Sequence, residues 1–444
     1  MPRRRVHAPL NVLINNRLVG RLSKEPSGAI AFQYDRSWLE WEYGFAVSLS
    51  LPVRETAYTG VPVSAVFDNL LPDNEGVRRR VAERTGADGT DAYSLLERIG
   101  RDCVGAMQFL PDDVPPDKDH AIRGEPVYED EIEQILANLG RAPLGIDQEH
   151  DFRISVAGAQ EKTALLFHDG QWMRPVGTTP TTHILKPQLG KIPTAFGEID
   201  MAASVDNEHY CLVLLSAFGL PVARTEIASF GKRRVLVVER FDRRWRDPSR
   251  LLRLPQEDCC QALGVPPSRK YQSEGGPSAA DILKLLQRAD TPLEDQAAFF
   301  ASQILFWLIG ATDGHAKNFS IFLRPGGRYG LTPFYDVLSA QPAFDKKQIP
   351  HRAYKLAMSV GKGRKYRLLD VAGRHFVETG REAGLGSTIM RQAITGILEN
   401  ADTAAARALA AMPNDFSDEV HISAAAAIRA RLPSLEVALG ELAP

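Results

Sequence analysis

An aspartate, an asparagine and a second aspartate lie close together in the sequence and could carry out phosphoryl transfer. Asp313 and Asn318 are five positions apart (318 − 313 = 5) in the run IGATDGHAKNF, and Asp336 follows in PFYDVLS. In such a reaction one Asp orients the attacking hydroxyl and accepts its proton. An Asn and a later Asp hold Mg²⁺, which neutralises charge on the phosphate oxygens. The spacing alone is weakly diagnostic, because Asp and Asn are common turn residues.

The elements expected around this loop strengthen the prediction. The loop follows an apolar, helix-like segment (297–310) and precedes two strand-like runs (319–323 and 329–336), which the turn RPGGR joins. Protein-kinase catalytic loops place their base and their metal-binding Asn at the same spacing. We therefore expect Asp313 to act as the base, with Asn318 and Asp336 as metal ligands.

Four elements that come earlier in the chain could bind a nucleotide. They are a glycine turn around Gly158, a strand carrying Lys186, a helix carrying Glu208, and an apolar strand (235–238) that runs into Glu239. Each has an ordinary alternative: a β-turn, a snorkelling lysine, a solvated helix glutamate and a core strand. Lys186 and Glu208 could instead form an ion pair of the kinase type. The order of these elements before the catalytic loop is that of a two-lobed kinase, which favours a phosphotransferase.

The remaining pattern predicts a two-lobed α+β fold, α/β toward the N-terminus and mostly helical toward the C-terminus. Residues 1–115 indicate an α/β subdomain with a hairpin turn at Asn15-Asn16, strands within 29–41 and 45–53, and one helix over 66–86. A Pro/Asp-rich linker and a short helix occupy 116–150. A kinase N-lobe with nucleotide loop and hinge then spans 151–255, and a helical C-lobe with the catalytic loop spans 256–444.

Composition narrows the functional class. The net charge is −2, so no global field attracts the chain to nucleic acid or to a membrane surface. The basic start MPRRR lacks the apolar run of a signal peptide, and no stretch approaches the length of a spanning helix. The four cysteines lack metal-ligand spacing, so we expect buried or half-buried free thiols in a reducing cytoplasm.

The motifs together resemble the HipA family of serine/threonine-kinase toxins, which belong to HipBA toxin–antitoxin modules. The similarity is carried by ISVAGAQEKTALL, THILKP, SVDNEHYCL, VERFDRRW, LLRLPQEDCCQALG, LIGATDGHAKNFS and LTPFYDVLSA, and by FDNLLPD and IGRDCVGA in the N-terminal part. It covers most of the chain up to about Ala340 and weakens over the last 104 residues (444 − 340 = 104). The single glycine of the nucleotide loop departs from eukaryotic kinases but agrees with this family.

The resemblance implies a role for individual residues. Asp313 would be the catalytic base, and Ser155 would be the serine that the kinase autophosphorylates to inactivate itself. ATP would be held by residues of the nucleotide loop, the strand lysine, the hinge and the catalytic region: Ala157, Gly158, Ala159, Gln160, Glu161, Lys162, Lys186, Glu239, Arg240, Phe241, His315, Ala316, Lys317, Asn318, Tyr335 and Asp336. Asn318 and Asp336 would also hold Mg²⁺.

The resemblance further implies partners and a biological effect. A HipB-like helix-turn-helix antitoxin would bind and neutralise the chain, and operator DNA would be reached through that antitoxin. The protein substrate would be glutamyl-tRNA synthetase, whose phosphorylation would cause growth arrest and persistence. We expect a cytoplasmic bacterial protein that becomes nucleoid-associated when bound to antitoxin and operator, and no membrane partner.

Two other functions remain as alternatives. A small-molecule kinase would share the Asp…Asn…Asp arrangement, although the N-terminal FDNLLPD unit argues against it. A non-enzymatic co-repressor bound to the antitoxin would not turn over ATP. The identity of the phosphorylated product separates the first alternative from a protein kinase, and ATP turnover separates the second.

Overall fold

The structure is a computed structural model that describes residues 7–116, 121–144 and 160–442. Two compact units are present. Unit 1 comprises Met1–Pro187, Ser229–Ser268 and Ile321–Tyr329, and unit 2 comprises Gln188–Ala228, Arg269–Ser320 and Gly330–Pro444. The chain therefore passes between the units several times. The predicted four-part division of the chain stays a prediction.

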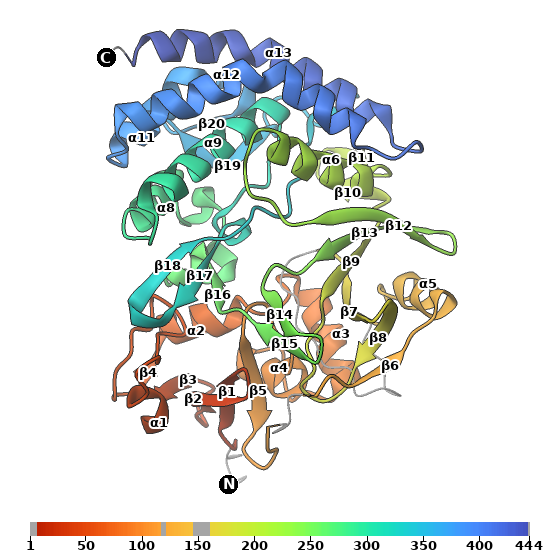
Figure 1. The fold of residues 1–444 in the computed structure, drawn as a ribbon, viewed down its shortest axis with the longest axis vertical. Coiled ribbons are helices and arrows are strands. Elements are labelled where there is room, and N and C mark those ends of the chain that lie inside the picture. Colours follow the sequence, from red (N-terminus) through yellow and green to blue (C-terminus); the bar gives the residue numbers. More distant parts are fainter. Residues whose placement is uncertain (1–6, 117–120, 145–159, 443–444) are drawn as a thin grey trace. The chain divides into compact units, whose positions relative to one another are not determined.

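The first sheet of unit 1 is antiparallel, with the strand order β4-β3-β2-β1-β5. The expected turn at Asn15-Asn16 is confirmed, because both residues have positive φ angles (47° and 65°), as a tight hairpin requires. Helices α2 and α4 pack on this sheet (Figure 1). The elements are β1 (Leu10–Ile14), β2 (Arg17–Lys24), β3 (Ile30–Tyr34), α1 (Arg36–Leu39), β4 (Tyr58–Thr59), α2 (Val61–Asp68), α3 (Glu75–Thr85), α4 (Ala92–Ile99) and β5 (Met107–Pro111).

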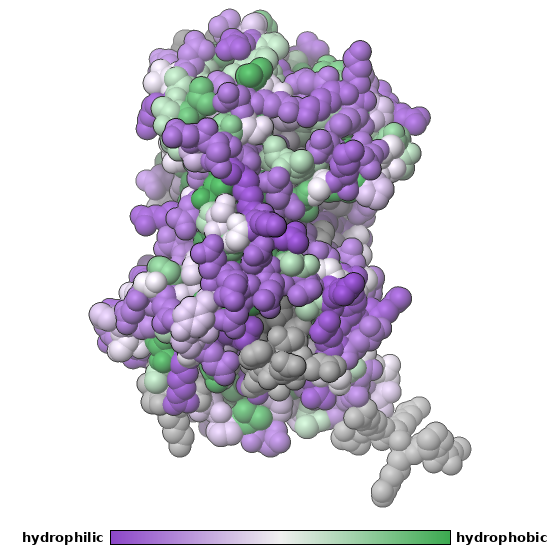
Figure 2. Space-filling model, turned by 90° about the vertical axis from the view of Figure 1, so that its right-hand side faces the viewer, coloured by the Kyte–Doolittle hydropathy of each residue, from purple (hydrophilic) through white to green (hydrophobic). Residues whose placement is uncertain are grey.

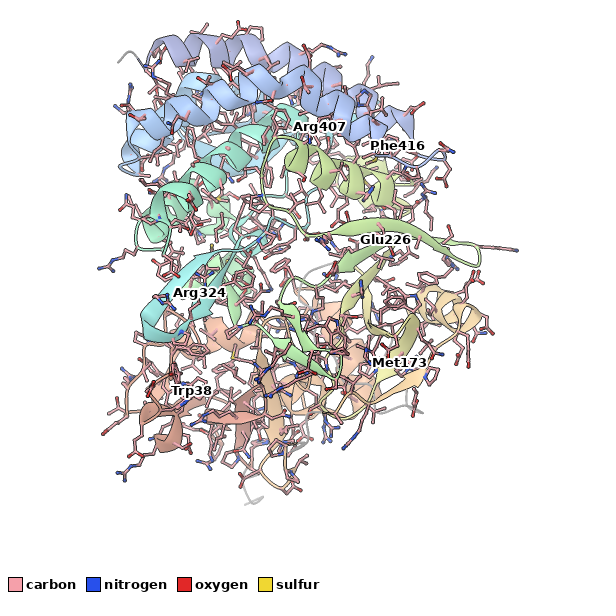
Figure 3. The ribbon with its side chains drawn as sticks, in the orientation of Figure 1. Trp38, Met173, Glu226, Arg324, Arg407 and Phe416 are labelled. Atoms are coloured by element: carbon pink, nitrogen blue, oxygen red, sulfur yellow. The ribbon has the colours of Figure 1, made fainter. Side chains whose placement is uncertain are left out.

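Two local predictions in this part are wrong. The single helix expected over 66–86 is two helices, α2 and α3, because Pro72 interrupts the run and Asn74 caps α3 by accepting from the Val77 N–H. The strand expected over 45–53 is irregular, since the Leu49 N–H donates to Glu257 rather than to a neighbouring strand. Trp38 of α1, labelled in Figure 3, is buried and donates its indole N–H to the Phe45 carbonyl.

A second sheet has the strand order β12-β13-β9-β7-β8-β6, and helix α5 packs against β13. Its strands belong to unit 1 except for residues 225–228 of β12, which are assigned to unit 2. The strands predicted around Lys186 and before Glu239 are confirmed as β9 and β13, which pair antiparallel. The elements are β6 (Gly124–Pro126), α5 (Glu129–Ala137), β7 (Thr163–His168), β8 (Gln171–Pro175), β9 (His183–Pro187), β12 (Thr225–Phe230) and β13 (Arg233–Glu239).

Shorter elements follow β13. They are the hairpin β14 (Arg243–Asp247) and β15 (Arg250–Arg253), then β16 (Gln256–Asp258) and α7 (Cys259–Ala262). The hairpin that follows the catalytic loop, β17 (Ser320–Arg324) and β18 (Arg328–Leu331), lies beside β16 in a three-stranded sheet. Residues Ile321–Tyr329 of this hairpin belong to unit 1, whereas the sequence assigns the whole hairpin to the C-lobe.

Unit 2 is mainly helical, as predicted, and is built around α9, whose side chains are buried on nearly all faces. Helices α8, α11, α12 and α13 pack on α9, and α12 also packs on α6 (Figure 1). The helices are α6 (Ser204–Ala217), α8 (Ala279–Leu286), α9 (Pro292–Ile309), α10 (Gln341–Asp345), α11 (Gly373–Glu382), α12 (Ser387–Ala410) and α13 (Asp418–Gly440). Two hairpins are added: β10 (Lys191–Thr194) with β11 (Gly197–Asp200), and β19 (Lys355–Val360) with β20 (Lys365–Arg367).

An aromatic contact links α6 to the segment before α13. Tyr210 of α6 stacks on Phe416, labelled in Figure 3, with ring centroids 5.7 Å apart.

The face in Figure 2 is mostly hydrophilic, with apolar residues scattered over it. Among the described residues, no helix is long and apolar enough to cross a membrane. The four cysteines are free and buried, which confirms that part of the prediction.

Candidate active site

The predicted catalytic loop begins where α9 ends at Gly310, which caps the helix in the left-handed conformation (φ 71°). Side-chain methyl groups are excluded on both sides of Asp313. A Cβ on Gly310 would overlap the hydroxyl oxygen of Tyr354, and a Cβ on Gly314 would lie 2.6 Å from the Phe306 ring. The loop therefore packs closely on α9 and its neighbours, and this packing sets where Asp313 stands.

Asp313 is exposed, but hydrogen bonds hold both its main chain and its side chain. Its carbonyl oxygen accepts from the His315 N–H at 2.8 Å and from Nδ2 of Asn318 at 2.8 Å. Its carboxylate oxygen Oδ1 accepts from the hydroxyl of Tyr271 at 2.6 Å. An exposed carboxylate held in one orientation suits a group that must accept a proton from an incoming hydroxyl.

The two candidate metal ligands, Asn318 and Asp336, follow the base in the same unit. With Nδ2 of Asn318 donating to Asp313, the side-chain oxygen of the amide is left as the ligand atom. Asp336 has a φ of 59°, a conformation that residues other than glycine seldom adopt and that often marks a functional site. An amide oxygen and a carboxylate are hard oxygen donors of the kind that Mg²⁺ prefers, so the residues fit the expected ion.

Hydrogen bonds fix the segment that leads to Asp336. The Phe334 N–H donates to the Pro221 carbonyl, and the Ala223 N–H donates to the Phe334 carbonyl, both at 2.8 Å. The hydroxyl of Tyr335 bonds to that of Ser320 at 2.6 Å and donates to the Lys317 carbonyl at 3.1 Å. The structure thus brings together five predicted residues within unit 2: Asp313, Lys317, Asn318, Tyr335 and Asp336.

His315 and Ala316 are the buried residues of the loop next to Asp313. Burial lowers the pKa of His315, although the nearby charge of Asp313 acts in the opposite direction. In the described part of the chain, no hydrogen-bond partner meets Nδ1 of His315. Its ring contacts the Tyr271 ring edge-on, with centroids 4.9 Å apart. His315 is therefore a neutral side chain at neutral pH and packs against Tyr271.

The predicted nucleotide residues on β7, β9 and the loop before them lie in unit 1. Lys162 and Lys186 are both buried, and Lys186 pairs across the sheet with Leu236 of β13. Nε2 of Gln160 donates to the Pro187 carbonyl at 3.3 Å, which ties the end of the nucleotide loop to the end of β9. Glu161 forms an ion pair with Arg80 at 3.6 Å. Ser155, Ala157, Gly158 and Ala159 lie outside the described residues.

The predicted hinge residues follow β13. Glu239 is exposed and pairs with His183 of β9, and the Phe241 ring contacts the Phe322 ring edge-on at 6.0 Å. The Arg240 guanidinium is buried and bonds to other protein groups, so its side chain supports the hinge from inside. The Arg240 N–H donates to the Thr182 carbonyl at 2.8 Å.

Arg240 belongs to a buried charge cluster that we define as Asp102, Arg240, Asp242, Arg243 and Arg253. Asp102 lies 2.9 to 3.2 Å from all three arginines, and Asp242 lies 2.8 and 2.9 Å from Arg240 and Arg243. Burial by itself would raise the pKa of Asp102, but the three guanidinium groups hold it well below the usual range. The cluster joins the segment between α4 and β5 to the segment that follows β13, within unit 1.

Sequence reasoning missed this cluster and Tyr271. The charged residues of IGRD and ERFDRR are flanked by apolar residues in the sequence. This pattern is the one sequence signal that could have indicated the cluster. Tyr271 lies 42 positions before Asp313, and no spacing rule links the two.

Glu208 on α6 is buried, so the solvated alternative is wrong. The neighbouring Asn207 exchanges two hydrogen bonds of 2.8 Å with Ser339, which fixes α6 next to the segment after Asp336. Lys186 and Glu208 belong to different units, and their pairing stays a prediction.

Comparisons with known proteins identify the family. The model of the HipA-like C-terminal domain matches residues 154–406, and that of the HipA N-terminal domain matches residues 10–110. The protein Y4mE of Sinorhizobium fredii, which is named a kinase, is 35% identical over 436 residues, 96% of this chain and 99% of Y4mE. The serine/threonine-protein kinase toxin HipA of Shewanella oneidensis is 28% identical over 364 residues, 79% of this chain and 78% of that protein.

A solved structure agrees with this. The Shewanella oneidensis HipA chain, in a complex with HipB and operator DNA, matches with a TM-score of 0.80 and 25% identity, over 97% of this chain and 99% of that one. The mixed helix-and-strand fold is therefore that of HipA proteins, as the sequence predicted. The chain belongs to the HipA family of toxin–antitoxin proteins.

Proposed function

We propose that this protein is a serine/threonine-protein kinase toxin that transfers the γ-phosphoryl group of Mg-ATP to a protein hydroxyl. The observation that carries the proposal is the exposed Asp313 in a chain of the HipA family, whose carbonyl accepts from Asn318 and whose carboxylate accepts from Tyr271. Relatives named as kinases support the same chemistry.

The residues divide the chemistry among them. Asp313 orients the acceptor hydroxyl through a carboxylate oxygen and takes its proton as the oxygen–phosphorus bond forms and the bond to ADP breaks. Lys162 and Lys186 neutralise the phosphates of the nucleotide. Asn318 and Asp336 would hold Mg²⁺, which supplies positive charge to the phosphate oxygens when bound. The loop Ala157–Lys162 covers the phosphates.

The hinge recognises the base of the nucleotide. The main chain of Glu239 and Phe241, at the end of an apolar strand, contacts adenine, and Arg240 between them is held by its N–H bond to the Thr182 carbonyl. The buried charge cluster supports this conformation from within the fold, because the Arg240 side chain is bonded to Asp102 and Asp242. His315, Ala316, Lys317 and Tyr335 complete the nucleotide site.

Control of the kinase follows from its chemistry and its relatives. Autophosphorylation of Ser155 adds about −1.5 to −2 charge at the entrance of the nucleotide loop, which switches the kinase off. A HipB-like antitoxin neutralises the toxin and links it to operator DNA, where the pair represses its operon. The complex of the Shewanella oneidensis HipA with HipB and operator DNA supports these partners.

The protein substrate is a translation factor, and the family resemblance favours glutamyl-tRNA synthetase, whose phosphorylation arrests growth. The protein acts in the bacterial cytoplasm and is nucleoid-associated when bound to antitoxin and operator. Because the solved relative is in a complex with HipB and operator DNA, the second candidate function is that of a co-repressor without kinase activity.

A phosphoproteomic comparison in bacteria tests this function. The chain and its Asp313→Gln variant are expressed briefly without antitoxin. Phosphate on glutamyl-tRNA synthetase and on Ser155 with the unmutated chain alone supports the proposal. Phosphate on another translation factor keeps the kinase and rejects the target, and identical phosphosites in both samples favour the co-repressor.

A further inference from the structure

A short segment of unit 2 places Tyr271 against the catalytic base. The segment turns through Gln272–Glu274 and ends at Gly275, which has a φ of 89°. The Tyr271 carbonyl accepts from the N–H groups of Glu274 and Gly276, both at 3.0 Å. A Cβ on Gly276 would lie 2.8 Å from the same carbonyl oxygen, so the turn closes tightly around the Tyr271 backbone.

The next residue anchors the turn to the rest of the unit. Oε1 of Gln272 accepts from the Ser359 N–H at 2.7 Å and from the Ser359 hydroxyl at 3.1 Å, which ties the turn to strand β19. The position of Tyr271 is thus set by its own turn on one side and by β19 on the other. A side chain held in this way can impose an orientation on a group that it contacts.

The group that Tyr271 contacts is the Asp313 carboxylate. The phenol donates to Oδ1 of Asp313 at 2.6 Å, and the Tyr271 ring lies edge-on to His315, whose centroid is 4.9 Å away. Asn318 and the His315 N–H hold the carbonyl of Asp313 but leave its side chain free to rotate. The Tyr271 hydroxyl therefore provides the side-chain contact that selects one carboxylate orientation.

We propose that Tyr271 is a positioning residue of the kinase, which fixes the Asp313 carboxylate so that Oδ2 meets the acceptor hydroxyl. This inference rests on the proposed function. A carboxylate has two oxygens with about four lone-pair directions, so a hydrogen bond at Oδ1 leaves Oδ2 available as the base. Without the phenol, the carboxylate samples other rotamers, and a smaller fraction of bound complexes is aligned for transfer.

An inhibitory role of Tyr271 would change the transfer rate in the opposite direction. If the phenol stood in for the acceptor hydroxyl and blocked the base, its removal would speed the reaction. A purely structural role would act through the fold or through nucleotide binding. Tyr271→Phe separates these roles, because it deletes one oxygen and keeps the ring against His315 and the turn around Tyr271.

The experiment uses the purified full-length chain and measures single-turnover phosphate transfer from radiolabelled ATP to casein and to the chain itself. Nucleotide affinity is measured separately with a fluorescent ATP analogue. We expect Tyr271→Phe to transfer phosphate about tenfold more slowly, as the loss of one hydrogen bond to a charged group implies. Its nucleotide affinity and melting temperature should stay unchanged. Tyr43→Phe, which alters an exposed tyrosine of unit 1, is the matched control and should behave as wild type.

Three results would overturn the proposal: an unchanged transfer rate, a faster rate, or a loss that is matched by an equal loss of nucleotide affinity. The proposed function fails in a different way, because the unmutated chain would then transfer no phosphate at all. Gln272→Ala gives a second test, since it removes the anchor to Ser359 without touching Asp313. We expect it to lower the transfer rate in the same direction as Tyr271→Phe.

Discussion

At the scale of single residues, the environment of each carboxyl group decides what it can do. Asp313 is exposed and accepts hydrogen bonds at its carbonyl and at one carboxylate oxygen. Glu257 is buried, and its Oε1 accepts from the Leu49 N–H at 2.8 Å. Burial raises the pKa of Glu257 to about 8. One carboxyl group is thus placed for chemistry, while the other keeps its proton inside the fold at neutral pH.

Glu257 makes stability depend on pH in a predictable direction. Its pKa is raised from 4.5 to about 8, so between these values the folded chain keeps a proton that the unfolded chain has released. Stability from this group is therefore complete below pH 4.5 and is lost as the pH rises through 8. The Glu257→Gln variant carries a neutral amide of similar shape, so it does not lose this stability as the pH rises.

Urea denaturation of both proteins at several pH values measures this effect. We expect the stability of Glu257→Gln relative to wild type to rise by up to about 1.4 kcal/mol for each pH unit within the window. A difference that does not change with pH would contradict a buried neutral Glu257.

At the scale of elements, the end of α9 and the loop after it act as one piece. Gly310 ends the helix with a positive φ, and Ala340 donates its N–H to the Gly310 carbonyl at 2.8 Å. The Ser339 hydroxyl donates to the Ile309 carbonyl at 2.6 Å. These bonds connect the end of α9 to the segment after Asp336, so Asp313 and Asp336 are positioned together.

Gly310→Ala should damage this connection. A Cβ at Gly310 would overlap the Tyr354 hydroxyl and would strain a left-handed residue. We expect a loss of about 1–3 kcal/mol of unfolding free energy. The rate of phosphate transfer should fall in proportion to the fraction of the protein that unfolds. Denaturant titration and a transfer assay at low temperature measure the two effects.

Gly396→Ala is the matched control, because a Cβ at that position of α12 meets nothing within 4 Å. Alanine also favours a helix over glycine by about 0.5–1 kcal/mol, so this variant should be as stable as wild type or more stable. Equal stability of Gly310→Ala and Gly396→Ala would show that the end of α9 does not need a glycine.

At the scale of the whole molecule, the order of the expected elements along the chain predicted more of the fold than any single motif did. The catalytic loop, the strand of Lys186 and the helices of unit 2 follow from periodicity and spacing, which are local signals. The break at Pro72, the irregular segment around Leu49 and the buried charge cluster depend on partners more than 100 residues away or on turn chemistry. Local patterns carry no information about such partners, and the contact of Tyr271 with Asp313 was missed for the same reason.

The buried charge cluster provides a prediction at this scale, because it joins the N-terminal part of the chain to the hinge within unit 1. Asp102→Asn keeps the shape of the side chain but leaves three buried guanidinium groups with only Asp242 to neutralise them. We expect a loss of about 3–5 kcal/mol in unfolding free energy, measured by guanidinium denaturation.

Asp35→Asn is the control, because Asp35 forms an ion pair with the exposed Arg21 at 3.1 Å. An exposed pair contributes at most about 1 kcal/mol, so this variant should stay close to wild type. Equal effects of the two substitutions would mean that the cluster does not stabilise the fold.

The measurement that tests the central claim most directly is phosphate transfer from ATP by the purified chain, compared with its Asp313→Asn variant. The substitution keeps the size of the side chain and removes its ability to accept a proton. We predict that the unmutated chain phosphorylates protein serine or threonine and that the variant loses at least about 100-fold in rate while its melting temperature is unchanged. Equal transfer by both proteins, or no transfer by the unmutated chain with Mg-ATP, would contradict the account.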